Sequence, residues 1–97
     1  MDRINQLAAV RAAIDAEDPE GLLALGCPAD EYSHEVSIIA AKIHELALRK
    51  GSQATAEEMA ELVTEVWIQY FGPFNTIDLE KRKSSFLAVG HRLAGQL

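Results

Sequence analysis

Apolar residues return every three or four positions along most of the chain, a spacing that places them on one face of an α-helix. Four segments follow this pattern: the first fifteen or so residues, a stretch from about Ser33 to Lys50, a stretch from Thr55 to Phe71, and one that starts between Thr76 and Asp78 and runs nearly to the end. No segment alternates apolar and polar residues as a half-buried strand does. The pattern predicts an all-α protein, with residues 1–97 forming a single four-helix bundle-like domain.

Residues with capping chemistry mark most of the predicted helix ends. Thr55 followed by Glu58 is a capping box, in which each side chain bonds the backbone N–H of the other residue. Asp2 and Ser33 are predicted N-caps of the first and second helices. Gly51 is predicted to end the second helix in a left-handed conformation.

Glycines also constrain the last two helices. Gly72 followed by Pro73 predicts the end of the third helix, because proline cannot continue it. Gly90 lies inside the fourth helix, where glycine costs roughly 1 kcal/mol relative to alanine. We therefore expect either that a neighbouring helix approaches closely at Gly90 or that the helix bends there.

The segment between the first two long helices has an unusual composition, "DPEGLLALGCPADEYSHE" at residues 18–35. In "DPEG", a proline after an aspartate and a glycine two positions later are typical of a turn. "LLALG" predicts one short extra helical turn that Gly26 ends and that Pro28 prevents from continuing. Three leucines of this turn are expected to cover one end of the bundle: Leu22, Leu23 and Leu25.

The second half of that segment, "DEYSHE", allows two interpretations. Negative charge is stabilised at a helix start, so Asp30, Glu31 and Glu35 fit a structural role there, with Tyr32 packing on the leucines. The alternative is an acidic and aromatic surface that binds a basic partner, with Tyr32 as its anchor.

The formal net charge of −6 is unevenly distributed. Residues 1–70 contain 13 acids and five bases, whereas residues 71–97 contain two acids and four bases. The acidic part disfavours nucleic acid as the partner, because the phosphates would repel it. A basic protein is the natural counterpart. The run "EKRK" at residues 80–83 is expected to be a solvated face of the last helix.

We therefore expect a non-enzymatic, acidic protein-binding module. Its predicted partner-binding residues are Asp30, Glu31, Tyr32, Glu35, Glu57, Glu58 and Glu61. The alternative is a structural or regulatory protein that forms homodimers through an apolar patch. That patch would contain Trp67, Tyr70, Phe71 and Phe74.

No catalytic, metal or cofactor motif is recognisable. His34 and His44 are ten residues apart on one predicted helix, nearly three turns, which is too far to share one ion. Cys27 has no recognisable base or oxyanion hole. The chain is therefore expected to be no enzyme and to bind no cofactor.

Composition also predicts where the protein acts. A hydrophobic content of 48% with 25% charged residues argues against disorder. No stretch reaches the roughly 18 consecutive apolar residues of a membrane span, and the N-terminal residues lack the apolar core of a signal peptide. A single cysteine favours a reducing compartment. Together these features predict a cytoplasmic protein without membrane contact.

Eleven residues in the segment 18–35 also resemble a family pattern. The pattern is an Asp-Pro, a Gly-Leu-Leu, a Gly-x-Pro, an Asp-Glu-Tyr and a later Glu, and it is similar to that of small all-helical bacterial proteins of unknown function. The matching residues are Asp18, Pro19, Gly21, Leu22, Leu23, Gly26, Pro28, Asp30, Glu31, Tyr32 and Glu35. The resemblance implies a helical fold and no catalytic residue. A looser likeness, in size and acidity alone, is to bacterial immunity proteins and antitoxins, which neutralise a basic toxin domain by occupying its cleft.

Overall fold

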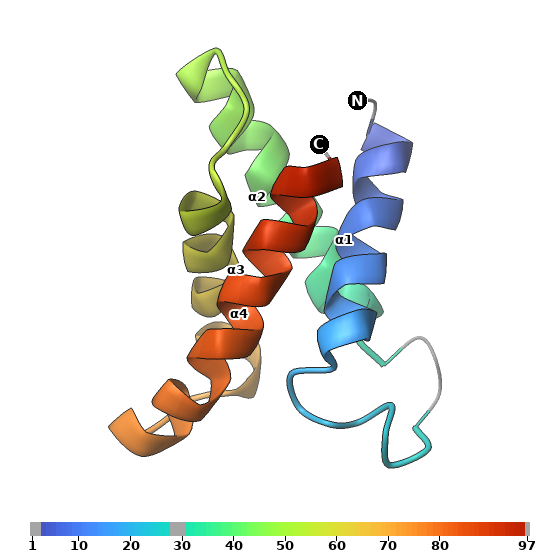
Figure 1. The fold of residues 1–97 in the computed structure, drawn as a ribbon, viewed down its shortest axis with the longest axis vertical. Helices are drawn as coiled ribbons and strands as arrows, with labels where there is room; N and C mark the ends of the chain where they lie inside the picture. The colour runs from blue at the N-terminus through green and yellow to red at the C-terminus, as the bar shows by residue number, and fades with distance from the viewer. Residues whose placement is uncertain (1–2, 28–30, 97) are drawn as a thin grey trace.

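The computed structural model describes residues 3–27 and 31–96, and these residues form four helices (Figure 1). The helices are α1 (Arg3–Glu17), α2 (Ser33–Lys50), α3 (Ala56–Phe71) and α4 (Thr76–Gln96). The predicted all-α class and the four helices are therefore confirmed. The predicted N-cap Asp2, the break at Pro28 and the acid Asp30 lie outside the described residues.

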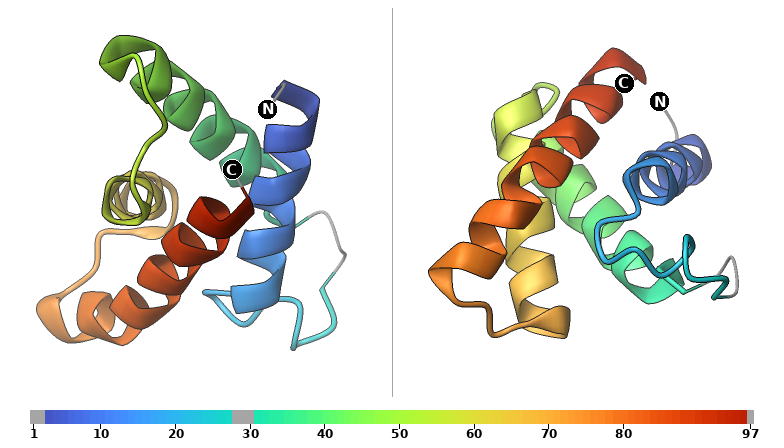
Figure 2. Two further views of the ribbon diagram at one scale, coloured as in Figure 1. Left: turned by 45° about the horizontal axis from the view of Figure 1, so that its top comes forward. Right: turned by 60° about the horizontal axis from the view of Figure 1, so that its bottom comes forward.

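The helices are arranged in a ring. Helix α1 packs on α2 and α4, and α3 packs on the same two neighbours. Across the ring, no described Cα atoms of α1 and α3, or of α2 and α4, lie within 8 Å of each other. The helices cross one another at an angle and do not share one axis, since α3 is seen end-on in a view where α2 and α4 lie along the page (Figure 2). The Cα radius of gyration of 12.7 Å is close to the roughly 13 Å expected for a compact chain of about 100 residues.

All four helices contribute to one hydrophobic core. Its largest fully buried side chains are Trp67, Tyr32, Phe86, Ile14, Ile39, Ile43, Met59, Leu93, Val10, Val36, Val63 and Val66. The predicted inner faces are confirmed at most positions. The apolar spacing also places Leu7 and Tyr70 on the inner faces of their helices, but each is 41% exposed.

The predicted caps are confirmed at the start of α3 and at the end of α2, and wrong at the start of α2. The capping box of Thr55 and Glu58 is present in full, and Gly51 ends α2 in the left-handed conformation (φ 70°). The predicted N-cap Ser33 is instead the first helical residue of α2, and Tyr32 occupies the cap position with no side-chain bond to the described part of the helix. Ser33 Oγ accepts a hydrogen bond from Arg11 Nη2 at 2.6 Å, so it ties α2 to α1.

Gly90 allows α4 to approach α3 closely. A Cβ atom at Gly90 would overlap the carbonyl oxygen of Ala56 and lie 3.2 Å from the Cβ of Ala60. Gly90 is buried at this contact. Of the two explanations that the sequence allowed, close approach by a neighbouring helix is thus confirmed.

Candidate protein-binding site

Asp18 organises the segment that follows α1. Its backbone has a positive φ of 42°, a conformation that aspartate tolerates better than most residues, and its N–H donates to the carbonyl of Ile14 at 2.8 Å to close the helix. The carboxylate then accepts hydrogen bonds from the N–H groups of Leu23 and Ala24. The Tyr32 hydroxyl donates to the same carboxylate at 2.6 Å.

Tyr32 is buried in the core, so its predicted role as an interface anchor is wrong. The side chain is fully inaccessible. Its hydroxyl accepts from the backbone N–H groups of Glu20 and Leu22, and its ring lies 5.5 Å from that of Trp67 and 6.4 Å from that of Phe71, centroid to centroid. Because a buried phenol needs hydrogen-bond partners, the segment 18–24 folds around the Tyr32 hydroxyl.

Glu20 joins three parts of the chain in a contact that we call the Glu20 clasp, formed by Glu20, Trp67 and Arg82. The indole N–H of Trp67 donates to Glu20 Oε1 at 2.7 Å. Arg82 donates to both carboxylate oxygens, through Nε at 2.6 Å and Nη2 at 2.9 Å. The guanidinium also lies 4.4 Å above the ring of Phe74. The "EKRK" run had predicted a solvated face. For Arg82 this prediction is wrong.

Sequence reasoning missed Glu20, although two signals pointed to it. Trp67 falls on the apolar stripe of its helix, and a buried indole N–H requires an acceptor. Arg82 falls on the inner side of the last helix, where a charge requires an opposite charge. Both signals called for an acid, but the sequence did not indicate which one, because Glu20 is 47 residues from Trp67 and 62 residues from Arg82.

These contacts shift the pKa values of the groups involved. Hydrogen bonding from Arg82 lowers the pKa of Glu20, although burial acts in the opposite direction. Burial raises the pKa of Asp18, but the bonds from Tyr32 and from backbone amides outweigh it, and the net shift is downward. Burial, assisted by Asp18, raises the pKa of the Tyr32 phenol. In the folded state both carboxylates are held ionised and the phenol is held neutral.

The short leucine-rich turn is present, and two of its three leucines cover the core as predicted. Cys27 N–H bonds the carbonyl of Leu22 and Gly26 N–H bonds that of Leu23, which is the pattern of a glycine-terminated helical turn. Leu22 and Leu23 pack against the core. Leu25 is 79% exposed, so its predicted place in the cover is wrong.

The remaining predicted acids near the start of α2 do not form one surface. Glu35 is only 8% exposed, and its Oε2 has no hydrogen-bond partner among the described residues. Its predicted role in contacting a partner is wrong, because the packing of α2 turns it inward. Glu31 is exposed. With Tyr32 and Glu35 inside, residues 31–35 contribute mainly to the packing of α2.

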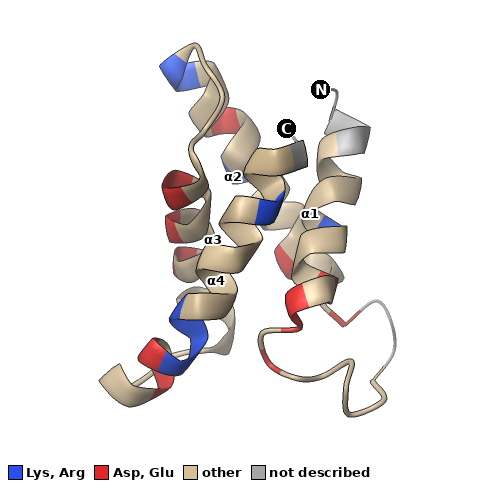
Figure 3. Ribbon diagram, viewed as in Figure 1, with Lys and Arg blue, Asp and Glu red and all other residues tan. Residues whose placement is uncertain are grey.

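The predicted acids on α3 lie on the outside of the molecule, where acidic residues mark successive turns of the side turned away from α1 (Figure 3). Glu57, Glu61 and Glu65 are exposed and four residues apart, so they follow one face of the helix. Glu58 is only half-exposed and is used internally, since it accepts from Lys50 Nζ and from the backbone N–H of Thr55.

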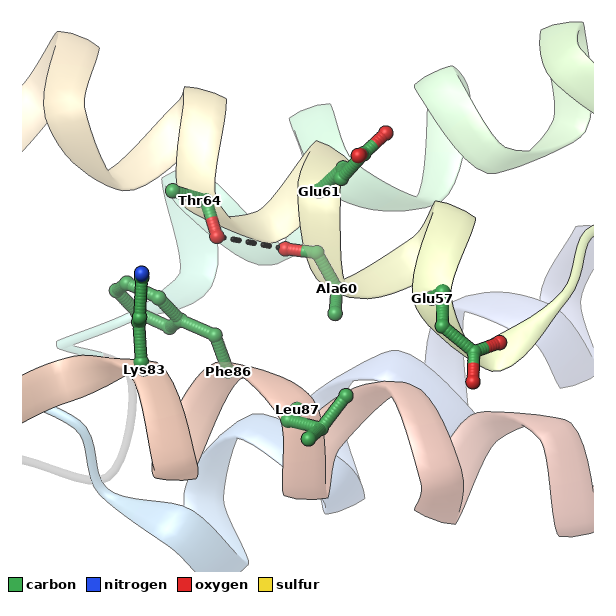
Figure 4. Close-up of a pocket in the computed structure, with 7 residues that line it drawn as sticks. All are labelled: Glu57, Ala60, Glu61, Thr64, Lys83, Phe86 and Leu87. Atoms are coloured by element: carbon green, nitrogen blue, oxygen red, sulfur yellow. Dashed lines mark hydrogen bonds between the residues drawn. The ribbon is translucent and has the colours of Figure 1, made fainter. Parts of the chain in front are cut away.

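Two of these acids border a surface hollow of about 250 Å³ between α3 and α4, which we call the α3–α4 groove. Its lining residues are Glu57, Ala60, Glu61, Thr64, Lys83, Phe86 and Leu87 (Figure 4). The floor is apolar, and Leu87 is 44% exposed. The hollow is smaller than the roughly 300 to 1,000 Å³ of sites for small organic ligands, so it suits a side chain of a protein partner better than a free metabolite.

The packing of α4 on α3 shapes this groove. The two helices are antiparallel (Figure 1) and meet most closely where Gly90 lies against Ala56 and Ala60. Phe86, one turn before Gly90, is buried and lines the hollow from α4. Thr64 lines it from α3, and its hydroxyl bonds the carbonyl of Ala60.

The aromatic patch of the homodimer alternative is not exposed as a unit. Trp67 is fully buried, and Phe71 and Phe74 are packed against the core. Tyr70 is exposed and contacts His34 edge to face, with 4.9 Å between ring centroids. The four residues therefore do not form the exposed patch that this alternative requires.

In the described part of the chain, no three His, Cys, Asp or Glu side chains lie close enough together to hold a metal ion. Neither Cys27 nor a histidine lines the α3–α4 groove or a second hollow of about 430 Å³ beside Glu45, Leu48 and Arg49. Among residues 3–27 and 31–96, no helix is long and apolar enough to cross a membrane.

In comparisons with known proteins, no family model, curated protein or solved structure matches the chain. The resemblance of residues 18–35 to a bacterial family therefore remains a prediction. What the structure adds is a physical reason for part of that pattern, since Asp18 and Tyr32 bond each other directly.

Proposed function

We propose that this protein is a non-enzymatic binding module whose α3–α4 groove receives a basic segment of a partner protein. The observation that carries the proposal is the combination in one hollow of an apolar floor and acidic edges. Leu87 and Ala60 offer apolar surface, and the exposed carboxylates of Glu57 and Glu61 border it. An apolar centre with a charged rim is the usual anatomy of a protein interface.

Charge supports a basic partner. The chain carries a formal net charge of −6, and Glu65 extends the acidic edge of α3 by one more turn. Complementary charge accelerates encounter and excludes wrong partners. A basic toxin domain in the cytoplasm, neutralised as by an immunity protein or antitoxin, is the most specific form of the proposal.

The proposal is tested by titration with a synthetic helical peptide that carries lysine on one face and leucine on the other. The double variant Glu57→Gln/Glu61→Gln should bind this peptide roughly twofold to thirtyfold more weakly, since each exposed ion pair contributes about 0.2 to 1 kcal/mol. The matched control is Glu45→Gln, which removes an exposed acid from α2. If the control loses as much affinity as the double variant, the groove is not the binding site.

The immunity form has a separate test in cells. The protein is co-expressed with the reading frame immediately upstream in its source genome, and growth is measured. We expect the wild-type chain to restore growth and the Glu57→Gln/Glu61→Gln variant to restore it less well. A neighbour that is harmless by itself would contradict this form, while the peptide titration would still test the general one.

A further inference from the structure

The charges of the α3–α4 groove have an order along its length. Glu57 lies at one end on α3, with Glu61 one turn further along that helix, and Lys83 lies at the opposite end on α4 (Figure 4). Leu87 lies between Glu57 and Lys83. Lys83 contacts only Glu80 among the described acids, one turn away on the same helix. That ion pair is more than half exposed on both sides, so it contributes little and is easily exchanged.

The groove has an apolar centre, with the acid Glu57 on one edge and the base Lys83 at the diagonally opposite edge. A second copy of the same groove is therefore complementary to it. A two-fold axis that passes through the centre of the groove exchanges its two ends. It would place the partner's Glu57 against Lys83 and the partner's Lys83 against Glu57, and would bring the two Leu87 side chains together. Such an isologous arrangement is the commonest form of protein dimer.

We infer that a second copy of this chain seats on the α3–α4 groove around such an axis. The net charge of each chain opposes association, but at physiological ionic strength charges separated by more than about 8 Å are largely screened. The two Glu57–Lys83 pairs are in direct contact and are screened least. The dimer thus forms through α3 and α4. The aromatic residues at the end of α3 keep their positions in the monomer and take no part in the dimer.

This dimer also regulates binding, a consequence that rests on the proposed function. The second copy covers the same Leu87 and Glu57 that a basic partner needs. A partner and a second copy therefore exclude each other, and the monomer is the form that binds. The apolar floor of the groove is covered until a basic partner displaces the second copy.

The test is sedimentation equilibrium of the full chain over a wide concentration series, with charge-reversed variants. Lys83→Glu places two acids at the ends of the groove, and Glu57→Lys places two bases there. Each variant alone should dimerise roughly tenfold more weakly or worse, because like charges then face each other. Mixed together, the two variants should associate, because each end of one then faces the opposite charge on the other.

Two further variants keep the inference open to refutation. Lys81→Glu changes the same charge at an exposed position of α4 that does not line the groove, and it should dimerise like the wild type. Leu87→Ser should weaken the dimer without any change of charge, which matters if Glu57→Lys fails to fold. A wild-type chain that stays monomeric throughout, a mixture that stays monomeric, or equal losses in Lys81→Glu and Lys83→Glu would each overturn the inference.

The same samples separate this inference from the proposed function. The lysine–leucine peptide should bind the monomeric Lys83→Glu variant at least as tightly as it binds the wild type, and it should dissociate the wild-type dimer. Peptide binding by a chain that never dimerises would overturn only the dimer. A dimer that the peptide neither binds nor dissociates would overturn only the proposed function.

Discussion

At the scale of single residues, Tyr32 has a different role in the structure from the one that the sequence suggests. In the sequence it stands among acids and suits a polar, aromatic surface. In the structure its hydroxyl bonds Asp18 and two backbone N–H groups, and its ring packs on Trp67. The sequence shows the acids beside Tyr32 but not the loop fourteen residues earlier that folds over it.

Removal of this hydroxyl should destabilise the protein. Tyr32→Phe leaves the N–H groups of Glu20 and Leu22 without their acceptor and leaves Asp18 without its hydroxyl donor. We expect the free energy of unfolding to fall by about 1 to 3 kcal/mol, measured by urea denaturation followed through the fluorescence of Trp67. Tyr70→Phe, which removes a hydroxyl from an exposed ring, is the control. Equal effects of the two substitutions would contradict the assignment.

Acid should weaken the fold through the carboxylates of Asp18 and Glu20. Both have pKa values below their ordinary values of 3.8 and 4.5, so the unfolded state binds protons at a pH where the folded state does not. Stability is therefore fully present above about pH 5 and falls as the pH drops through the folded pKa values. Denaturation midpoints measured across this pH range give the dependence of stability on pH.

The variant Glu20→Gln isolates the contribution of the Glu20 clasp to the dependence of stability on pH. The variant cannot ionise at this position and loses the charge that Arg82 binds. It should be less stable than the wild type at neutral pH and should lose less stability in acid, so that the two curves converge at low pH. Parallel curves would show that the pKa of Glu20 does not contribute.

At the scale of elements, helix ends were the most predictable features because their chemistry is local. The capping box of Thr55 and Glu58 and the left-handed Gly51 each depend on residues within one turn, and both are confirmed. Ser33 shows the limit of this reasoning, since its hydroxyl bonds Arg11 on another helix and does not cap α2. Local chemistry names the residues that can cap, and tertiary contacts decide which of them do.

Gly90 sets the distance between α3 and α4 and gives a prediction for the helix pair. Gly90→Ala should lower the free energy of unfolding by about 1 to 3 kcal/mol, because the added methyl group meets the backbone of Ala56. Gly95→Ala is a matched control on the same helix, where no described atom lies within 4 Å of the added Cβ.

Helix propensity alone predicts the reverse outcome at Gly90. Alanine is favoured over glycine in a helix by up to about 1 kcal/mol, so Gly95→Ala should leave stability unchanged or raise it. Thermal denaturation of both variants compares the two effects directly. If Gly90→Ala stabilises the protein as much as Gly95→Ala does, the close approach of the helices is not what glycine provides.

At the scale of the whole molecule, the Glu20 clasp and the α3–α4 groove have different roles. The clasp ties residues 18–24, α3 and α4 together through partly buried contacts, whereas the groove is open to solvent. The sequence predicted the exposed acids Glu57 and Glu61, because the polar face of an amphipathic helix is evident from spacing. It could not predict that Lys83 and Leu87 would join them, because that depends on how α4 packs along α3.

We propose that the binding surface lies on α3 and α4 and not in the acidic segment before α2. The most direct measurement is an NMR titration of the isotope-labelled protein with the lysine–leucine peptide. We predict the largest chemical-shift changes at the amides of Glu57, Glu61 and Leu87, with Glu31 and Tyr32 nearly unchanged. Changes centred on Glu31 and Tyr32, with the α3–α4 groove unaffected, would contradict a binding surface on α3 and α4.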